Sequence, residues 1–353
     1  MTNAKPKKEI RIIRTNLENS ELKMSMVHKL NTLRSNPKAT FSRYTAKILK
    51  DSAYFLMHGP LKSPSNREAE LIRELRCNLE EYSVSAKESI KAENLWTENE
   101  NELRELIRKK DPREFLRWNV IRRNMFPDSA PYIRKEFSYL TKNNWNTWKN
   151  SITETKVGCP APFLRYLPSS ENLIHTAYHL ARFENQTKEE IKDADLIVEF
   201  GGGYGCMCRL IHNIGFKGKY VIFDLPVFSA LQVFYLKMIG LNAEYGISSH
   251  ADGISCVSKT SQIEVIARSP TKKSLFIATW SISETPVEAR SPILKSVEAF
   301  DLFLIAYQRT FSNIDNVTFF DDWTKHTDQF YWYNCEITHI PNSYYLFGRK
   351  IPN

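Results

Sequence analysis

The stretch DLIVEFGGGYGCMCRL, residues 195–210, limits the fold of this chain more than any other segment. An apolar, strand-forming run comes first, four glycines follow within five residues, and a helix-forming run comes after them. A glycine inside an ordered element costs roughly 0.5–1 kcal/mol relative to alanine. Four glycines together therefore predict a tight turn between a strand and a helix, where a ligand comes close to the backbone.

Apolar strand-like segments alternate with helical segments from this point onward. Two of them, 274–280 and 301–307, are apolar throughout, as is typical of central parallel strands that are covered on both faces. The other predicted strands are 195–200, 219–224, a weaker one at 242–247, and two in a C-terminal hairpin, 331–350. The alternation predicts an α/β fold with a Rossmann-like sheet that is mainly parallel and has an antiparallel C-terminal hairpin.

The N-terminal part of the chain has a different pattern. Up to about residue 190, apolar residues recur at helical spacing and no segment shows a convincing strand pattern. Ser169 or Ser170 is suited to cap the helix that we predict over 169–183. We divide the chain into a basic leader that is partly disordered or helical, a helical N-terminal domain and an α/β domain, at residues 1–60, 61–165 and 166–353.

The charge of the chain is concentrated at one end. The first 50 residues carry twelve Lys and Arg against three Glu, which equals the net charge of +9 of the whole chain. Such a leader favours an anionic membrane surface, a phosphorylated substrate or nucleic acid as a partner, or forms a solvated tail. No window reaches the roughly 20 apolar residues of a membrane span. The six cysteines include no CxxC pair, so we predict a soluble, cytoplasmic protein with reduced thiols.

The spacing of the glycines distinguishes between two classes of nucleotide ligand. A dinucleotide-binding turn follows the order GxGxxG, and no register of these glycines meets it, which disfavours a dinucleotide-dependent oxidoreductase. The chain has instead Glu199-x-Gly201-x-Gly203-x-Gly205, which suits a ligand without a pyrophosphate. Asp224 ends the next strand, where a carboxylate can accept hydrogen bonds from both hydroxyls of a ribose.

Glu199, these glycines and Asp224 resemble the first two motifs of class I S-adenosylmethionine-dependent methyltransferases. The segments EFGGGYG, DLPVFSALQVFYL and TWSISETPVEAR, with residues 111–140 upstream, resemble the sugar O-methyltransferase family of bacterial polysaccharide biosynthesis. The similarity covers the chain from about residue 100 to its end. Ser274 is a departure, since such enzymes often have an acid at the start of this strand, and we assign no role to it.

The resemblance implies that S-adenosylmethionine is the cofactor. It implies that Gly201, Gly203 and Gly205 pass under the methionine and ribose parts of the cofactor. Glu199 would brace the turn or the amino group, and Asp224 would hold the ribose. The predicted cofactor set is completed by Tyr204, Leu225, Ser281 and, near the adenine edge, His250.

Methyl transfer to a hydroxyl needs a group that removes the proton, and a positioned base typically contributes about 10²–10⁴-fold. Glu284 directly follows the fourth strand, beside the first, and is one predicted catalytic residue; the alternative is an acid at a helix N-terminus. His326, in the loop before the hairpin, is the second. His175 and His179 share one helix face and either meet the substrate or pack in the core.

A divalent metal is the alternative to such a base. Asp321, Asp322, His326 and Asp328 lie close together in the sequence, and hard cations prefer carboxylates. Polar clusters of this kind are common in surface loops, so we predict no metal.

The predicted function is methylation of a hydroxyl on a sugar, whether nucleotide-linked, lipid-linked or within a glycan, in polysaccharide or glycoconjugate biosynthesis. Nucleic acid is a disfavoured acceptor, because residues 283–286 read SETP where amino-methylating DNA enzymes carry Asn/Asp-Pro-Pro-aromatic. The remaining alternatives are methylation of another small molecule and a non-catalytic scaffold with this fold. The helical half of the chain is expected to form either a lid or the surface of a homo-oligomer.

Overall fold

The computed structural model describes residues 58–85, 94–125, 131–250, 252–268 and 272–352. The chain divides into two units, residues 1–59 and 60–353, and the second unit contains the elements below. The basic leader lies almost wholly outside the described residues. Its predicted role at an anionic surface therefore stays a prediction. Among the described helices, none combines the length and the apolar character that crossing a membrane requires.

The described residues form a central sheet of eight strands. Neighbouring strands pair in parallel except at one edge, where a C-terminal hairpin adds two antiparallel pairings. The strands in spatial order are β11 (Phe330–Glu336), β12 (Ser343–Lys350), β8 (Leu302–Gln308), β7 (Ser274–Thr279), β3 (Leu196–Phe200), β4 (Lys219–Phe223), β6 (Ile254–Val257) and β5 (Ala243–Tyr245). This order confirms the predicted Rossmann-like α/β fold with its antiparallel hairpin.

One strand position differs from the prediction. The strand beside β4 is β6, which we did not predict, and the expected third strand at 242–247 is β5, one place further out at the sheet edge. The sequence of β6, ISCV, has only four residues and includes a serine, so its pattern does not distinguish it from a loop. Its pairing with β4 and β5 fixes it as a strand, which is a long-range effect.

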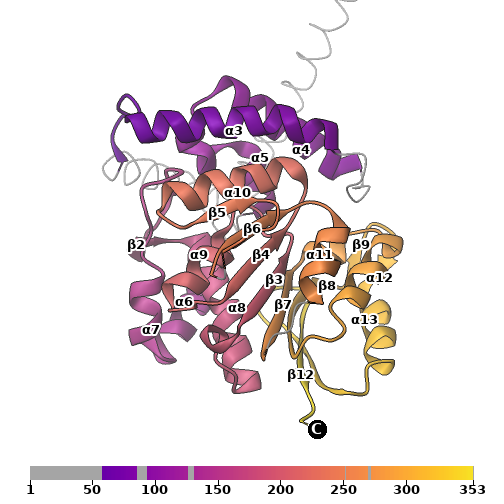
Figure 1. Ribbon diagram of the computed structural model, residues 1–353. Coiled ribbons are helices and arrows are strands. Elements are labelled where there is room, and N and C mark those ends of the chain that lie inside the picture. Colours follow the sequence, from indigo (N-terminus) through magenta and orange to yellow (C-terminus); the bar gives the residue numbers. More distant parts are fainter. Residues whose placement is uncertain (1–57, 86–93, 126–130, 251, 269–271, 353) are drawn as a thin grey trace, which may run out of the picture. The chain divides into compact units, whose positions relative to one another are not determined.

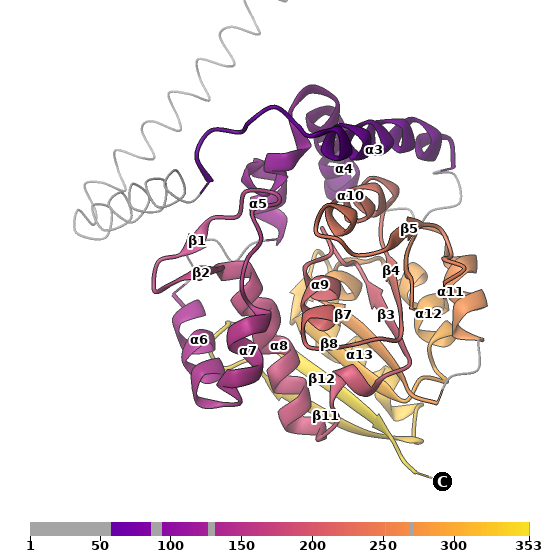
Figure 2. The same ribbon diagram turned by 60° about the vertical axis from the view of Figure 1, so that its left-hand side comes forward.

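Helices cover both faces of the sheet (Figure 2). On one face lie α8 (Glu171–Thr187), α9 (Cys206–Asn213) and α10 (Pro226–Met238), and on the other lie α11 (Thr260–Ala267), α12 (Val287–Ser296) and α13 (Asn316–Lys325). Successive strand residues point to opposite faces. Accordingly, Ile197 belongs to the core under α8–α10 and Val198 to the core under α11–α13.

The segments before residue 165 are mainly helical, as predicted. They comprise α3 (Asn66–Ser85), α4 (Asn94–Lys109), the 3₁₀ helix η2 (Pro112–Arg117), α5 (Asn119–Met125), α6 (Ile133–Lys142) and α7 (Trp145–Ser151). Asp111 caps η2 by accepting a hydrogen bond from the Arg113 backbone N–H, and Ser170 caps α8 in the same way through the Leu173 N–H. Ser170 is one of the two residues that we predicted as the cap of this helix.

The expectation of no strand before residue 190 was wrong at one place. The strands β1 (Pro162–Phe163) and β2 (Tyr166–Ser170) form a small antiparallel hairpin. Strands of two and five residues leave no readable alternation. Three further short elements are the 3₁₀ helix η3 (Ile191–Asp193) and the antiparallel pair β9 (Thr310–Phe311) and β10 (Ile314–Asp315).

Helix α3 lies across α10, at the top of Figure 1. The Lys237 ammonium of α10 pairs with the Glu74 carboxylate of α3 at 2.6 Å. The core under α8–α10 also takes in Leu71 and Leu75 of α3. The helical segment is thus packed on the sheet unit, and the predicted domain boundary near residue 165 stays a prediction.

Candidate active site

A cavity of about 410 Å³ opens at the carboxyl ends of β3, β4, β6 and β7. The chain leaves β3 toward β4 on one side and later returns to β7 on the other side of β3. Ligands of open α/β sheets bind at such a switch point, outside the carboxyl ends of the strands. We call the lining from Glu199, Gly201, Gly202, Gly203 and Asp224 the glycine wall, and the lining from Tyr132, His175, His179 and Trp280 the histidine wall.

The glycine turn is required first by the backbone and by neighbouring side chains. Gly201, Gly203 and Gly205 have φ values of +73°, +58° and +94°, in the region that glycine adopts readily. A Cβ on Gly201 would lie 2.2 Å from the Ser281 Cβ. A Cβ on Gly202 would lie 2.4 Å from Ile222. We predicted that a ligand comes close to the backbone of the turn. At these two glycines, side chains of the protein come close to it instead.

Three of the turn residues still face the cavity. The cavity is lined by the backbone of Gly201, Gly202 and Gly203. Tyr204, which follows them, also lines it. Gly205 does not line the cavity and instead occupies the N-cap position of α9. The structure thus brings most of the predicted glycine set to one wall, with Gly205 serving the helix behind it.

Asp224 holds the glycine turn through its carboxylate. Its Oδ2 accepts hydrogen bonds from the Gly203 N–H and from the Gln232 amide, both at 2.9 Å. Its Oδ1 accepts one bond, from the Leu225 N–H at 2.8 Å. A carboxylate oxygen accepts two hydrogen bonds, so Oδ1 keeps capacity for a ligand hydroxyl. Burial raises the pKa of the Asp224 carboxyl to about 7, against the pull of these N–H donors.

Glu199 lies at the end of β3 and is only 4% exposed. Its Oε2 accepts a hydrogen bond from the Tyr220 hydroxyl at 2.8 Å. Burial raises the pKa of this carboxyl to about 8, and the nearby Asp224 adds to the rise while the Tyr220 hydroxyl opposes it. Among the described residues no cation lies within ion-pairing distance of Glu199. The glycine wall therefore carries two carboxyls that favour a positively charged partner.

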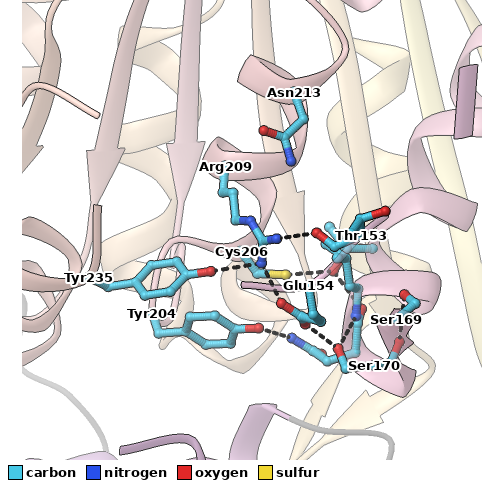
Figure 3. Close-up of polar contacts among 12 residues, drawn as sticks. Thr153, Glu154, Ser169, Ser170, Tyr204, Cys206, Arg209, Asn213 and Tyr235 are labelled. Carbon is cyan, nitrogen blue, oxygen red and sulfur yellow. Dashed lines mark hydrogen bonds and ion pairs between the residues drawn. The ribbon is translucent and has the colours of Figure 1, made fainter. Parts of the chain in front are cut away.

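A buried polar network supports the turn from behind (Figure 3). The Tyr204 hydroxyl accepts a hydrogen bond from the Asn172 amide at 2.9 Å. The guanidinium of Arg209, which is 2% exposed, pairs with the Glu154 carboxylate at 2.5 Å and donates to the Tyr235 hydroxyl at 3.1 Å. The network ties α9 and α10 to the segment that follows α7. We did not predict it, because Glu154 lies in a segment that reads as a loop.

The carboxyl end of β7 closes the cavity on another side. Ser281 donates a hydrogen bond from its hydroxyl to the Phe200 carbonyl and so fixes the 3₁₀ helix η4 (Ser281–Glu284) against the glycine turn. The Glu284 Oε1 accepts from the Gln308 amide at 3.3 Å, and the Ser283 hydroxyl donates to Gln308 at 2.7 Å. Glu284 lines the cavity, so the structure leaves it in place as a candidate base.

The two histidines of α8 also face the cavity. His175 and His179 line it, one turn apart, and the Trp280 ring packs against both, with centroids 5.5 Å and 5.1 Å away. Behind them the Glu136 carboxylate accepts hydrogen bonds from His175 Nδ1 and His339 Nε2, each at 2.9 Å. The sequence predicted that His175 and His179 share one face of a helix. Glu136 and His339 gave no signal, since nothing in the sequence relates positions that far apart.

Besides Gly205, two predicted site residues lie outside this cavity. His250 follows the edge strand β5 and is 59% exposed, with Glu244 at 3.8 Å. The residue that lines the cavity beyond the carboxyl end of β6 is Ser258. We placed His250 near the adenine edge because it follows the expected third strand, and in the structure β6 lies between that strand and β4. His326 is the C-cap of α13 and borders a second hollow beside Trp323. Leu225 and Ser281 do line the main cavity.

In the described part of the chain, no group of three or more His, Cys, Asp or Glu side chains is arranged to hold a metal ion. The cluster at 321–328 instead makes local contacts on and beside α13. The Asp322 carboxylate pairs with Lys325 at 2.8 Å, and Asp321 accepts from Asn334 at 3.3 Å.

No family model and no curated protein matches the chain. Solved structures similar to it include the methyltransferase PaMTH1 of Podospora anserina with bound S-adenosylhomocysteine, at 10% identity and TM-score 0.38, covering 65% of this chain and 99% of that one. Magnesium protoporphyrin IX methyltransferase of Synechocystis PCC 6803 with bound S-adenosylmethionine is 10% identical, with TM-score 0.34 and 64% and 99% of the two chains covered. Identities and TM-scores this low assign neither a family nor an activity to the chain.

Proposed function

We propose that this chain is an S-adenosylmethionine-dependent methyltransferase that methylates a hydroxyl group of a sugar. The observation that carries the proposal is the cavity at the switch point of the sheet, with the glycine turn and Asp224 on one wall and groups able to take a proton on another. The motifs that resemble class I methyltransferases form the glycine wall.

The residues of the glycine wall fit this cofactor. Asp224 Oδ1 has hydrogen-bonding capacity for a ribose hydroxyl. Trp96 and Phe228 line the cavity and pack edge to face, with centroids 6.2 Å apart, so they offer aromatic surface to an adenine ring. Glu199 is a carboxyl without a cationic partner among the described residues and suits the amino group of the methionine part.

S-adenosylmethionine supplies, when bound, a methyl group that its positive sulfonium activates toward nucleophiles. The task of the protein is then to hold the acceptor oxygen and to take its proton. Alignment of two bound reactants can lower a barrier by roughly 7–11 kcal/mol. Apart from the carboxyls of the glycine wall, which we assign to the cofactor, Glu284 on η4 and the imidazoles of the histidine wall line the cavity and can accept a proton.

The sugar acceptor is supported by the composition of the lining. The aromatic residues Tyr132 and Trp280 line the same cavity as the uncharged polar residues Asn172, Thr176 and Thr285. The apolar C–H face of a pyranose packs on an aromatic plane, while its hydroxyls need neutral donors and acceptors. This combination is typical of a site for a polar, uncharged ring.

The test has two stages. Calorimetry with S-adenosylmethionine and with S-adenosylhomocysteine should give 1:1 binding, and absence of binding to both would overturn the cofactor assignment. Incubation with methyl-labelled cofactor and a panel of nucleotide sugars, glycans and RNA should then label a sugar. Label in RNA alone would overturn the acceptor assignment and leave the cofactor assignment intact.

A further inference from the structure

The ring nitrogens of the histidine wall are already engaged in hydrogen bonds within the protein. His175 Nδ1 contacts the Glu136 carboxylate at 2.9 Å, and His175 Nε2 lies 3.2 Å from His179 Nε2. The remaining nitrogen, His179 Nδ1, lies 2.5 Å from the Tyr345 hydroxyl oxygen. A neutral imidazole has one acceptor nitrogen. Neither ring therefore presents a lone pair to an acceptor hydroxyl in the cavity.

Glu284 has the hydrogen-bonding capacity that the two rings lack. It lines the cavity and is partly exposed. A carboxylate offers about four acceptor positions, and the Gln308 amide, at 3.3 Å from Oε1, uses one of them. The Glu284 carboxylate can thus accept a further hydrogen bond, from a hydroxyl that enters the cavity.

The Gln308 amide is held in the orientation that supports Glu284. The Ser283 hydroxyl donates to Gln308 Oε1 at 2.7 Å, which directs the Gln308 NH₂ group at Glu284. The reversed amide would place its oxygen against a carboxylate oxygen. The Trp280 carbonyl is also within reach of the Ser283 hydroxyl, but it already accepts from the backbone N–H groups of Ser283 and Glu284. The Ser283 proton is thus available to Gln308.

The backbone on both sides of Glu284 is held by Arg290 of α12, which is 0% exposed. Its Nε donates to the Thr285 carbonyl and its Nη2 to the Ser283 carbonyl, both at 2.6 Å. Trp280, directly before η4, has φ +63° although it is not a glycine. Strained backbone of this kind is characteristic of functional sites. The main chain around Glu284 is therefore fixed in a conformation that it would not adopt readily by itself.

Two further contacts connect this arrangement to both sides of the sheet. Arg290 Nη1 donates to Asn316 Oδ1 at 2.7 Å, and the Asn316 amide donates in turn to the Gln308 backbone carbonyl at 2.9 Å. At the other end of η4, the Ser281 hydroxyl donates to the Phe200 carbonyl, directly before the glycine turn. The position of η4 is thus set relative to the wall that we assign to the cofactor.

We propose that Glu284 accepts the proton of the acceptor hydroxyl and that Gln308 is its positioning residue. The inference rests on the proposed function. In the proton step the O–H bond breaks and the proton forms an O–H bond on the Glu284 carboxylate. The electron pair of the broken bond stays on the acceptor oxygen. This oxygen bonds to the methyl carbon as the carbon–sulfur bond of the cofactor breaks and leaves its electron pair on sulfur. Glu284 is partly exposed, so its proton then passes to water.

The first test needs neither cofactor nor acceptor. NMR of ¹⁵N-glutamine-labelled protein, assigned by Gln308→Met, reads the side-chain amide of Gln308. Hydrogen bonds to charged acceptors are the stronger ones, so an amide proton of Gln308 should move upfield in Glu284→Gln. Glu288→Gln is the matched control, because Glu288 is exposed in the first turn of α12 and does not line the cavity. A Gln308 signal that is the same in Glu284→Gln as in Glu288→Gln would overturn the proposal.

The second test uses the sugar identified by the labelling panel. Glu284→Gln should lower kcat about 10²–10⁴-fold, while S-adenosylhomocysteine affinity by calorimetry stays within about twofold. In Glu284→Ala, added formate should restore part of the rate, because it supplies the missing carboxylate. Glu288→Gln should leave kcat unchanged. A kcat of Glu284→Gln within about tenfold of wild type would overturn the proposal.

A double-mutant cycle distinguishes positioning by Gln308 from a purely structural role. Gln308→Met keeps the length of the side chain but cannot donate a hydrogen bond, and alone it should lower kcat about tenfold or more. In the Glu284→Gln background it should have no further effect on kcat, because the hydrogen bond acts through that carboxylate. An equal loss of kcat in both backgrounds would mean that Gln308 supports the fold alone, and the positioning role would be wrong.

The two proposals fail separately. Absence of cofactor binding to the wild-type protein would overturn the proposed function, whereas the contact between Gln308 and Glu284 would still be read by NMR. If His175→Gln abolishes turnover while Glu284→Gln, with an unchanged thermal midpoint, keeps it, the base lies in the histidine wall and the inference is wrong.

Discussion

The two walls of the cavity are built in opposite ways. The glycine wall comes from one strand, one turn and the end of the next strand, residues 199–224, and its shape is set by backbone dihedrals. The histidine wall is assembled from side chains that precede α6, lie on α8 and follow β7, and behind it Glu136 and His339 are in contact across 203 positions. A wall formed by one local segment can be predicted from a sequence motif. A wall formed by contacts between distant segments can be identified only once the fold is known.

Their electrostatics differ as well. At the glycine wall burial raises the pKa values of Glu199 and Asp224, because neither has a cationic partner in the described part of the chain. Behind the histidine wall burial acts on Glu136 too, but the imidazoles of His175 and His339 reverse the direction of its pKa shift. The carboxylate behind the histidine wall thus has charge partners within the protein, whereas the two carboxyls of the glycine wall have none among the described residues.

The largest effect is expected from Gly201→Ala, which changes the glycine wall alone. The new Cβ would lie 2.2 Å from the Ser281 Cβ, at a φ of +73°. Overpacking costs roughly 1–3 kcal/mol and the backbone strain on the order of 1–3 kcal/mol. We expect a loss of about 2–6 kcal/mol in the free energy of unfolding, measured in urea, and at least about 100-fold in S-adenosylhomocysteine affinity.

A matched glycine separates the two causes. Gly240 also has a positive φ, +88°, but a Cβ there meets no atom within 4 Å. Gly240→Ala should lose only the strain energy and keep its cofactor affinity. If Gly201→Ala behaves like Gly240→Ala in both measurements, the glycine wall is not set by the contact with Ser281.

The next prediction concerns the charge of the glycine wall. Asp224→Ala removes the acceptor of the Gly203 and Leu225 N–H groups and of Gln232. Losing a hydrogen bond to a charged group costs about 1.5–3 kcal/mol, so S-adenosylmethionine affinity in calorimetry should fall about tenfold or more. An unchanged affinity would remove Asp224 from the cofactor site.

The fold was readable from sequence where elements are long and apolar, and less so elsewhere. The runs of β7 and β8, the hairpin of β11 and β12 and the caps Asp111 and Ser170 follow local rules. The four residues of β6 become a strand only by pairing with β4 and β5. Because we did not predict β6, we expected His250 at the cofactor site, whereas in the structure it lies outside the cavity.

The candidate site, like the fold, could be predicted from the sequence only where local patterns determine it. The GxGxG spacing and the carboxyls at two strand ends place the glycine wall. The helical spacing of His175 and His179 places two rings on one face of α8. No local rule relates Glu136 to His339, or Arg209 to Glu154, because each pair is brought together only by packing of distant helices.

A smaller effect is expected from Glu199→Gln on the pH dependence of stability. The pKa of Glu199 is about 8 in the folded state and 4.5 as the ordinary value. Between these values the folded protein holds a proton that the unfolded chain releases, so this group's contribution to stability falls as pH rises. The slope is at most about 1.4 kcal/mol per pH unit. Glutamine mimics the protonated form, so urea unfolding of the variant should depend less on pH, by roughly 1–2 kcal/mol between pH 6 and 8. Parallel curves for the two proteins would mean that Glu199 has no raised pKa.

The smallest expected effect is that of His250→Ala, and it tests the strand order that underlies the comparison. His250 follows the edge strand β5, is largely exposed and lies outside the cavity, whereas Ser258 lines the cavity beyond β6. Surface substitutions away from special features usually change stability by less than about 0.5 kcal/mol. Affinity for S-adenosylhomocysteine should therefore stay within about twofold of wild type. A tenfold loss with His250→Ala, with no change for Ser258→Ala, would place the 242–247 segment beside β4 and make the glycine wall larger than the sheet register allows.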